Sequence, residues 1–528
     1  MNKILQNKFF ALETICFLCL SLILCVACSS DSSAGGSTED ETIVALKDKT
    51  ITGVSQKGPF VKGSSVTVQE LDGETFAQTG KSFKGKIISD AGDFELDIKS
   101  LISQYVLIEA NGYFFNEITG GKSNAPITLN AFSNIKERDN VNINLLTHLA
   151  YERTLYLVTK EDMPFSKAKK QAEQEVLKSF GIEEEFNDAE ELNIFGTENA
   201  NAALLAISIL MQKDLFEGDE QEAGLSERLT NYALDIETDG VWNDIEIQTK
   251  IADGVSFYTL EEHKARYTEN IAQWGISTEI PAFEKYIGVF WWINYGLGAC
   301  NAENEGEVKQ NINELSTYYQ VYYVCKNENW QVAEGKDLHD AGVDMELIDT
   351  RDGKAYKTIQ IGHQTWMAEN LNYETENSYC YDDDLANCEM YGRLYTREAA
   401  LNACPEGWHL PTNEEFETLI SNAGGSDVAG KMLKSTTGWL DGEDEFGQAL
   451  DGNGIDKYGF NVLPAGDRSS SGNFSFAGKV APFWSATEYD EYTAYSLQLE
   501  FSNEQAHLSW HDLDKDLAYS VRCLRGTN

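Results

Sequence analysis

The stretch CPEGWHLPTNEEFETLISNAGG, residues 404–425, decides how the last third of the chain folds. Thr412 and Glu415 have the spacing of a capping box, in which two side chains satisfy free backbone N–H groups at a helix N-terminus. Gly424 and Gly425 are typical of a helix C-terminus, because glycine adopts a left-handed backbone without strain. The sequence therefore predicts a short amphipathic helix between them, with an apolar face formed by Phe416, Leu419 and Ile420.

Two patterns on either side predict what this helix packs against. Residues 396–401 predict a second short helix, which the Thr396 hydroxyl can cap. Residues 495–501 alternate apolar and polar side chains, as a half-buried strand does. We therefore expect two helices packed against a twisted sheet.

A series of short motifs runs through the same region. They are GKAYKTIQIG at 353–362, QTWMAENLNY at 364–373, YGRLYT at 391–396, CPEGWHLPT at 404–412, YGFNVLPAG at 458–466, FWSATE at 483–488 and SVRC at 520–523. Together they closely resemble the Fibrobacter succinogenes major paralogous domain family. The resemblance implies a domain over residues 346–526 with the C-type-lectin-like α+β fold that is shared with formylglycine-generating enzymes.

The cysteines predict disulfides. Of ten cysteines, three lie in the first 27 residues and a fourth is Cys28. The other six form an even set, which in an exported protein predicts three disulfides out of 15 possible sets of pairs. In the resembling fold a disulfide commonly ties a helix end to the last strand, which implies Cys404 with Cys523, so that Cys380 and Cys388 close a local loop. The six are Cys300, Cys325, Cys380, Cys388, Cys404 and Cys523.

The first half of the chain predicts three further units, so that the whole is a multidomain α+β protein. Residues 49–144 fall into short β-rich runs between Gly and Asp turns, which predicts a small β-sandwich, and part of this text resembles carboxypeptidase-regulatory or transthyretin-like modules. Residues 145–295 repeat apolar side chains every three or four positions, which predicts a bundle of about five to seven helices. Residues 296–335 predict a short β unit that one disulfide closes, and Phe290-Trp291-Trp292 before it are expected in the core.

The N-terminus predicts export and lipid attachment. Residues 1–27 join a basic start to an apolar run that is shorter than a membrane span, as in a secretory signal. The run ends in Leu-Cys-Val-Ala-Cys at 24–28, which resembles a bacterial lipobox and implies a diacylglycerol on Cys28. Residues 28–48 are rich in Ser, Gly and acid and predict a flexible tether. Since Ser29 does not signal inner-membrane retention in the usual sorting pattern, we expect an outer-membrane lipoprotein facing either the periplasm or the outside.

The charge of the chain excludes one class of partner. Asp and Glu number 86 against 41 Lys and Arg, which gives a formal net charge of -45. A surface of this sign repels phosphate, so we expect no binding to nucleic acid. The remaining partners are the membrane, through the lipid, and a glycan or a surface protein.

The segment of residues 435–482, before the final strands, is the usual ligand surface of the resembling fold. Trp439 can stack on a sugar there, and the neighbouring acids Asp441, Glu443 and Asp444 can coordinate calcium, a cation that prefers oxygen ligands. A solvated acidic loop without a ligand is the alternative. As a group, the tryptophans of the region are expected mostly in the core, and they are Trp366, Trp408, Trp439 and Trp484.

Three functions are compatible with these patterns. The first is a non-catalytic envelope lipoprotein whose C-terminal domain binds a glycan or a protein, and the second is a purely structural scaffold of an envelope complex. The third is an enzyme related to the formylglycine generators, which need reactive cysteines, whereas these cysteines are expected to be paired. An exposed Trp439 would favour the first function and a buried one the second.

Overall fold

The computed structural model describes residues 42–213, 221–276, 279–343, 345–443, 449–490, 493–512 and 517–526. The predicted signal sequence, Cys28 and most of the tether lie outside these residues. The described part is a multidomain α+β protein, which confirms the predicted fold class, and residues 43–528 form one unit. Among its helices, none combines the length and the hydropathy that a membrane span requires.

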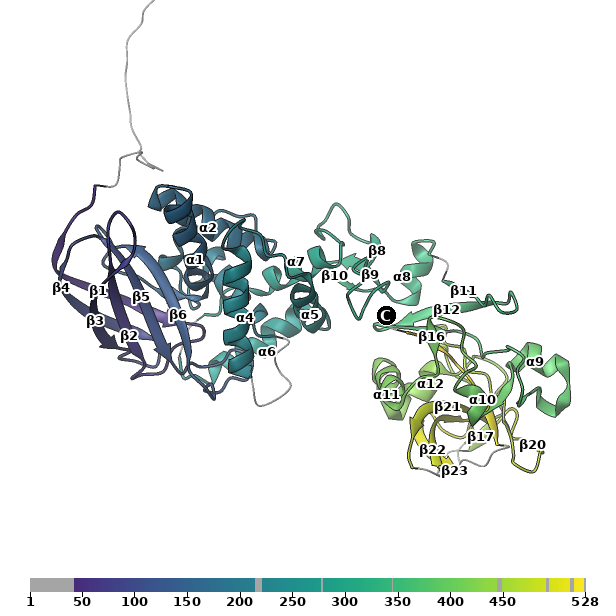
Figure 1. Cartoon of the computed structure of the whole chain (residues 1–528). Helices are drawn as coiled ribbons and strands as arrows, with labels where there is room; N and C mark the ends of the chain where they lie inside the picture. The colour runs from purple at the N-terminus through teal and green to yellow at the C-terminus, as the bar shows by residue number, and fades with distance from the viewer. Residues whose placement is uncertain are drawn as a thin grey trace, which may run out of the picture. The chain divides into compact units, whose positions relative to one another are not determined.

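Residues 46–144 form two β-sheets, with strand orders β4-β1-β7 and β3-β2-β5-β6 (Figure 1). Neighbouring strands are antiparallel, except that β1 and β7 are parallel. Val66 and Val68 of β2 are fully buried while Thr67 between them is half-buried, which is the two-residue period of a strand with one face in the core. The strands are β1 (Leu46–Gln56), β2 (Ser65–Leu71), β3 (Gln78–Lys86), β4 (Asp93–Leu101), β5 (Tyr105–Gly112), β6 (Ile127–Asn134) and β7 (Ile143–Asn144).

Seven α-helices follow in the described part of residues 145–294, within the range that the sequence predicts. From Ala202 to Leu210, α3 is buried on all sides and apolar apart from Ser208, as the centre of a bundle must be. α1 and α4 pack against β6 (Figure 1), and one hydrophobic cluster runs from the sheets through the helices. Phe290, Trp291 and Trp292 are buried in it, as predicted. The helices are α1 (Leu145–Lys160), α2 (Phe165–Ser179), α3 (Asn199–Leu210), α4 (Gln221–Ile236), α5 (Ile245–Ser256), α6 (Leu260–Ala272) and α7 (Glu284–Asn294), with the 3-10 helix η1 (Ala189–Glu191).

A buried ion pair joins the β-sheets to the helices. Lys57 Nζ lies 3.0 Å from Glu117 Oε2, and both side chains are fully buried. Lys57 Nζ also donates to the Ser208 carbonyl of α3 at 2.8 Å, while Gln212 Nε2 donates to Glu117 Oε2 at 2.8 Å. Burial lowers the pKa of Lys57, although the Glu117 carboxylate opposes this shift. The β and helical segments therefore share a polar contact as well as a core.

Residues 300–332 form a three-stranded sheet of order β10-β9-β8 that the Cys300–Cys325 disulfide closes. Gln360 of the next domain is 1% exposed. Both the oxygen and the nitrogen of its side-chain amide make hydrogen bonds with this unit. Its Oε1 accepts from Tyr322 N at 2.7 Å, and its Nε2 donates to the carbonyls of Tyr322 and Ala333 at 2.8 and 3.1 Å. The elements are β8 (Val308–Gln310), β9 (Tyr322–Lys326), β10 (Asn329–Val332) and α8 (Gly335–Asp340).

The C-terminal region contains two larger sheets. The first has the order β11-β12-β13-β25-β16, and the main path of the second is β14-β15-β24-β21-β22-β23. The first consists of β11 (Glu346–Ile348), β12 (Ala355–Ile361), β13 (Gln364–Met367), β16 (Trp408–His409) and β25 (Leu524–Arg525). The second consists of β14 (Ser378–Tyr379), β15 (Leu394–Thr396), β21 (Val480–Glu488), β22 (Thr493–Glu500), β23 (Ala506–Asp512) and β24 (Ala518–Ser520), with β19 (Asp467–Arg468) and β20 (Phe474–Ser475) beside it.

Two helices of this region, α10 and α11, begin where the sequence predicts. Thr412 and Glu415 form the capping box of α11, and Gly424 has a φ of 101° just after its end. Thr396 caps α10, which is one turn long. The helices are α9 (Leu385–Tyr391), α10 (Arg397–Ala400), α11 (Asn413–Asn422) and α12 (Ser426–Leu433), with the 3-10 helix η2 (Tyr381–Asp383).

Arg522 and a disulfide hold the last strand in place. The Arg522 guanidinium is 1% exposed and donates to Asn370 Oδ1 at 2.7 Å and to the Met367 carbonyl at 3.3 Å. It also donates to the carbonyl of Phe460, and burial lowers its pKa to about 9. Cys523, the next residue, is bonded to Cys404, and Cys380 to Cys388, so the three disulfides join the expected pairs.

The first prediction concerns the buried ion pair. Lys57→Met should lower the free energy of unfolding by about 3–5 kcal/mol, because it leaves the Glu117 carboxylate buried without a counter-charge. The double variant K57M/E117Q should recover much of this loss. Urea unfolding at pH 7 measures both. Lys62→Met is the matched control because Lys62 is exposed, and equal losses in K57M and K62M would contradict the account.

Candidate functional site

The segment of residues 435–482 does not present its tryptophan to a ligand. Trp439 is 4% exposed, and its Nε1 donates to Ser435 Oγ at 3.1 Å and to the Val462 carbonyl at 3.0 Å. Lys434 Nζ lies 5.0 Å from the centre of the ring. Trp439 therefore belongs to the core, and its prediction as a sugar-stacking side chain is wrong.

The acids beside Trp439 are only partly described. Asp441 is exposed, and Glu443 lies in β17 (Gly442–Glu443), whose backbone pairs with β18 (Ala449–Leu450). Asp444 lies outside the described residues. Among the residues that are described, no three His, Cys, Asp or Glu side chains are grouped so as to hold a metal ion. Calcium binding by this loop stays a prediction.

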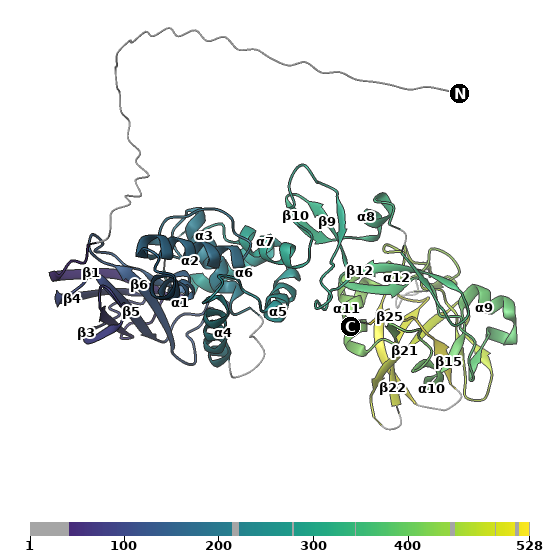
Figure 2. The same ribbon diagram turned by 45° about the horizontal axis from the view of Figure 1, so that its top comes forward.

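A cleft of about 510 Å³ lies beside β13, β16, β25 and α11. Figure 2 shows β25 close to α11. β25 lies between β13 and β16 in the sheet, and Gln364 of β13 donates to the Glu415 carbonyl of α11 at 2.9 Å, so these four elements form one wall of the cleft. Tyr318 and Phe257 contribute from the preceding units. The cleft thus combines side chains that are far apart in the sequence.

Trp408 and Arg525 lie directly across from each other in the strand pair β16–β25. Trp408 is half-buried, and the Arg525 guanidinium carbon lies 5.3 Å from its ring centre, which is a cation–π distance. Burial lowers the pKa of Arg525, although Tyr322 opposes the shift, and the guanidinium keeps its charge at neutral pH.

Glu415 lines the same cleft, but its carboxylate is already bonded. His409 Nε2 lies 2.8 Å from Oε1, and Thr412 N donates to Oε2 at 2.7 Å. Burial favours the neutral acid, but the hydrogen bonds from His409 and Thr412 outweigh it and hold the pKa of Glu415 below its usual value. Glu415 is therefore an ionised and compensated carboxylate.

His363 is a neutral and buried polar group of the cleft. Its ring lies 4.3 Å from the Tyr318 ring and 5.5 Å from the Phe257 ring. Burial lowers the pKa of His363 to about 4, so the imidazole is uncharged at neutral pH. Its Nε2 is buried and has no hydrogen-bond partner in the part of the chain that is described. An aromatic wall with one unsatisfied nitrogen suits a ligand that has both an apolar face and hydroxyl groups.

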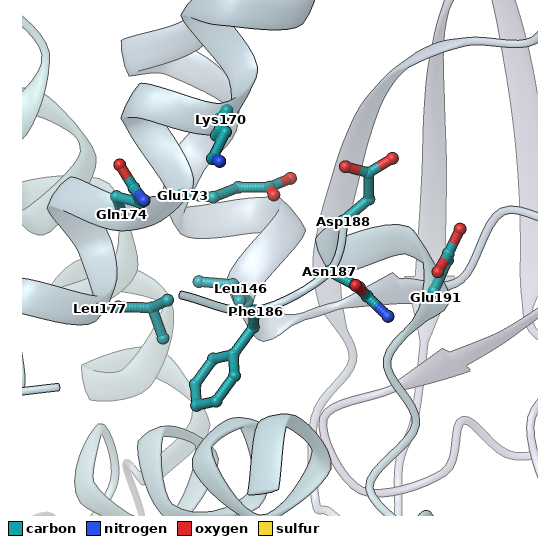
Figure 3. A pocket seen from close by; sticks show the side chains of 9 residues that line it. All are labelled: Leu146, Lys170, Glu173, Gln174, Leu177, Phe186, Asn187, Asp188 and Glu191. Atoms are coloured by element: carbon teal, nitrogen blue, oxygen red, sulfur yellow. The ribbon is translucent and has the colours of Figure 1, made fainter. Parts of the chain in front are cut away.

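A second cavity, of about 320 Å³, lies in the helical segment between α2 and η1 (Figure 3). The Glu173 carboxylate points toward Asp188, and Leu177 and Phe186 form the apolar side. Lys169 Nζ is shared by two carboxylates, at 3.2 Å from Glu173 and 2.8 Å from Glu190, which is 1% exposed. Burial, reinforced by the charges of Glu190 and Asp188 although Lys169 opposes them, raises the pKa of Glu173 to about 7. This carboxyl can therefore hold a proton near neutral pH.

Comparison with known families adds one assignment. Residues 359–525 match the model of the Fibrobacter succinogenes major domain. This Fibrobacter major domain contains β13, β16, β25 and α11, and therefore one wall of the cleft, whereas β11 and the start of β12 precede the match. No curated protein and no solved structure matches the chain significantly.

Sequence reasoning missed the residues of the cleft. Trp408 was expected in the core with the other tryptophans, and Trp366 and Trp484 are indeed fully buried. Trp408 differs because β16 is two residues long and lies at the edge of its sheet. Arg525 lies in β25, which is only two residues long, so no strand pattern in the sequence marked it.

The second prediction concerns Glu173. A carboxyl whose pKa is raised by folding stabilises the fold below its unfolded pKa, and that contribution is lost as the pH rises from about 4.5 through about 7. Glu173→Gln removes this titration, so the variant should gain stability relative to the parent across that window, on the order of 3 kcal/mol. Chemical unfolding at pH 5, 6, 7 and 8 measures the difference.

Glu246→Gln serves as the control for Glu173→Gln. Glu246 is exposed on the first turn of α5, so its removal changes the net charge equally without touching the cavity. The account is contradicted if the stability of E173Q relative to the parent does not change with pH. It is also contradicted if the stabilities of E173Q and E246Q change with pH in the same way, because Glu173 would then titrate normally.

Proposed function

We propose that the protein is a non-catalytic lipoprotein of the cell envelope and that its C-terminal domain binds a saccharide in the cleft beside Trp408. The observation that carries the proposal is one cavity in which aromatic rings and polar groups are combined. Sugar rings have an apolar face that packs on aromatic side chains, and their hydroxyls need hydrogen-bond partners. Thr418 and Asn422 of α11 line the same cleft and offer such partners.

The envelope location rests on the N-terminal sequence. A signal of 27 residues, a lipobox-like end and a Ser- and Gly-rich tether support lipid attachment at Cys28. The lipid then anchors the chain to the outer membrane, with the folded part on its periplasmic or its outer side.

The state of the cysteines supports a role without catalysis. The formylglycine-generating enzymes, which the C-terminal motifs resemble more distantly, depend on reactive cysteines. All six cysteines of the described residues are paired in disulfides. Among these residues no free thiol is left for that chemistry.

A structural scaffold is the second candidate, and the burial of Trp439 favours it. The resembling fold usually binds its ligand at the segment that corresponds to residues 435–482. In this chain Trp439 of that segment is buried in the core instead. Gln360 also fixes the C-terminal domain to the preceding β unit through three hydrogen bonds. A scaffold needs such fixed contacts between its units, and its cleft would hold no saccharide.

The third prediction separates the two candidates. The chain from Ser29 to Asn528 should bind at least one class of saccharide on an array of plant and bacterial glycans. Trp408→Ala should weaken that binding at least tenfold, or about 1.4 kcal/mol, because it removes one of the aromatic rings on which the sugar packs. Calorimetric titration with the best saccharide measures the loss.

Phe476→Ala is the matched control for Trp408→Ala, because Phe476 is a 56% exposed aromatic of the same domain outside the cleft. It should bind as the parent does. The scaffold is favoured if the folded parent binds no saccharide on the array. It is also favoured if W408A binds the saccharide as tightly as the parent does.

The fourth prediction concerns the anchor. Cys28→Ser should move the protein from the membrane fraction to the aqueous fraction of an expressing bacterium, because the thiol that carries the lipid is gone. Mass spectrometry of the mature N-terminus measures the lipid directly. Cys19→Ser is the control, since Cys19 lies in the part of the signal that is removed. An unmodified Cys28 in the parent would contradict the proposal.

A further inference from the structure

Arg525 differs in its environment from several other arginines of this acidic chain. The net charge is -45, and Arg153, Arg351 and Arg393 each have a carboxylate oxygen within 2.7–3.0 Å. Around Arg525, by contrast, the described residues place no carboxylate within ion-pair distance, although its side chain is half-buried. The guanidinium therefore brings a charge into the cleft that no described side chain compensates.

The position of the Arg525 side chain is fixed by its neighbours. Its backbone is paired with Trp408, its guanidinium lies over that ring, and Cys523 two residues earlier is held by a disulfide. Stacking on an aromatic face leaves the edge of the guanidinium, with its N–H donors, directed outward. Such a fork matches the two oxygens of a carboxylate.

Glu415, an acid that lines the cleft, does not compensate the charge of Arg525. Glu415 is engaged by His409 and by the Thr412 N–H, as described above, and makes no ion pair with Arg525. His363 is neutral, since burial lowers its pKa to about 4. Among the described lining residues, Arg525 is the uncompensated charge, and its complement is an anion.

We infer that the saccharide bound by this cleft carries a carboxylate, as uronic acids do, and that Arg525 binds this group while the aromatic wall holds the sugar ring. This inference rests on the proposed function and specifies its ligand class. Trp408 and Tyr318 contact the ring, and the Thr418 hydroxyl and the Asn422 amide meet the sugar hydroxyls.

The net charge of the chain favours short acidic ligands over long ones. A long polyanion would carry many carboxylates beyond the cleft, where the net charge of the chain, -45, repels them. At physiological ionic strength, charges more than about 8 Å apart are largely screened, so a short oligosaccharide experiences mainly Arg525. The best probe is therefore an oligomer of about three sugars.

The test compares trigalacturonic acid with its methyl ester, which keeps the rings and removes the charge. The Ser29–Asn528 chain should bind the acid at least tenfold more tightly than the ester in calorimetric titration. Arg525→Gln should abolish this difference, while Arg525→Lys should keep part of it, because the charge remains and the fork is lost. The temperature of thermal unfolding reports whether each variant is folded.

Lys457→Gln is the matched control because Lys457 is an exposed base of the same domain outside the cleft. It should leave the preference for the acid unchanged. Equal binding of acid and ester, lost in W408A, would overturn the carboxylate inference and keep the saccharide function. Binding of neither by the folded parent overturns the inference, and silence across the whole glycan array then overturns the proposed function as well. Tighter binding of a peptide with a free C-terminal carboxylate would identify a different ligand class and overturn both.

Discussion

The buried guanidinium of Arg522 is the interaction on which the C-terminal domain depends. A charge in the core costs several kcal/mol unless hydrogen bonds satisfy it, and here the acceptors are oxygens of Met367, Asn370 and Phe460. These residues come from segments far apart in the sequence, so they must converge on the last strand. That convergence places Arg525, three residues later, beside Trp408, and the cleft follows from it.

The same principle operates in the first half of the molecule. Lys57 and Ser208 are 151 positions apart, yet the Lys57 ammonium and the Glu117 carboxylate are buried together against α3. The sequence predicts the strands and the helices from their local periods, and it predicts α11 from Thr412 and Glu415. It does not predict that the two segments share one core, because no local pattern encodes a contact over such a separation.

In the candidate site, too, the local sequence does not determine which side chains are buried, because contacts with distant residues decide it. Gly407-Trp408 and Gly438-Trp439 look alike in the sequence. Trp439 is covered because Val462, 23 positions further on, accepts its N–H, whereas Trp408 is left half-buried by an edge strand. The disulfides were predictable because the resembling fold supplies one long-range pair. The cleft itself was not, because its walls belong to units that the sequence presents as separate.

Hydrogen exchange measured by mass spectrometry, with and without trigalacturonic acid, tests the central claim most directly, because it locates the ligand on the full described chain. The account predicts slower exchange confined to residues 317–321, 363–365, 407–422 and 524–526, which form the cleft. Protection of residues 435–482 instead would return the site to the loop that sequence analysis chose. No protection anywhere in a folded chain would contradict the assignment of the cleft as a site for acidic saccharides.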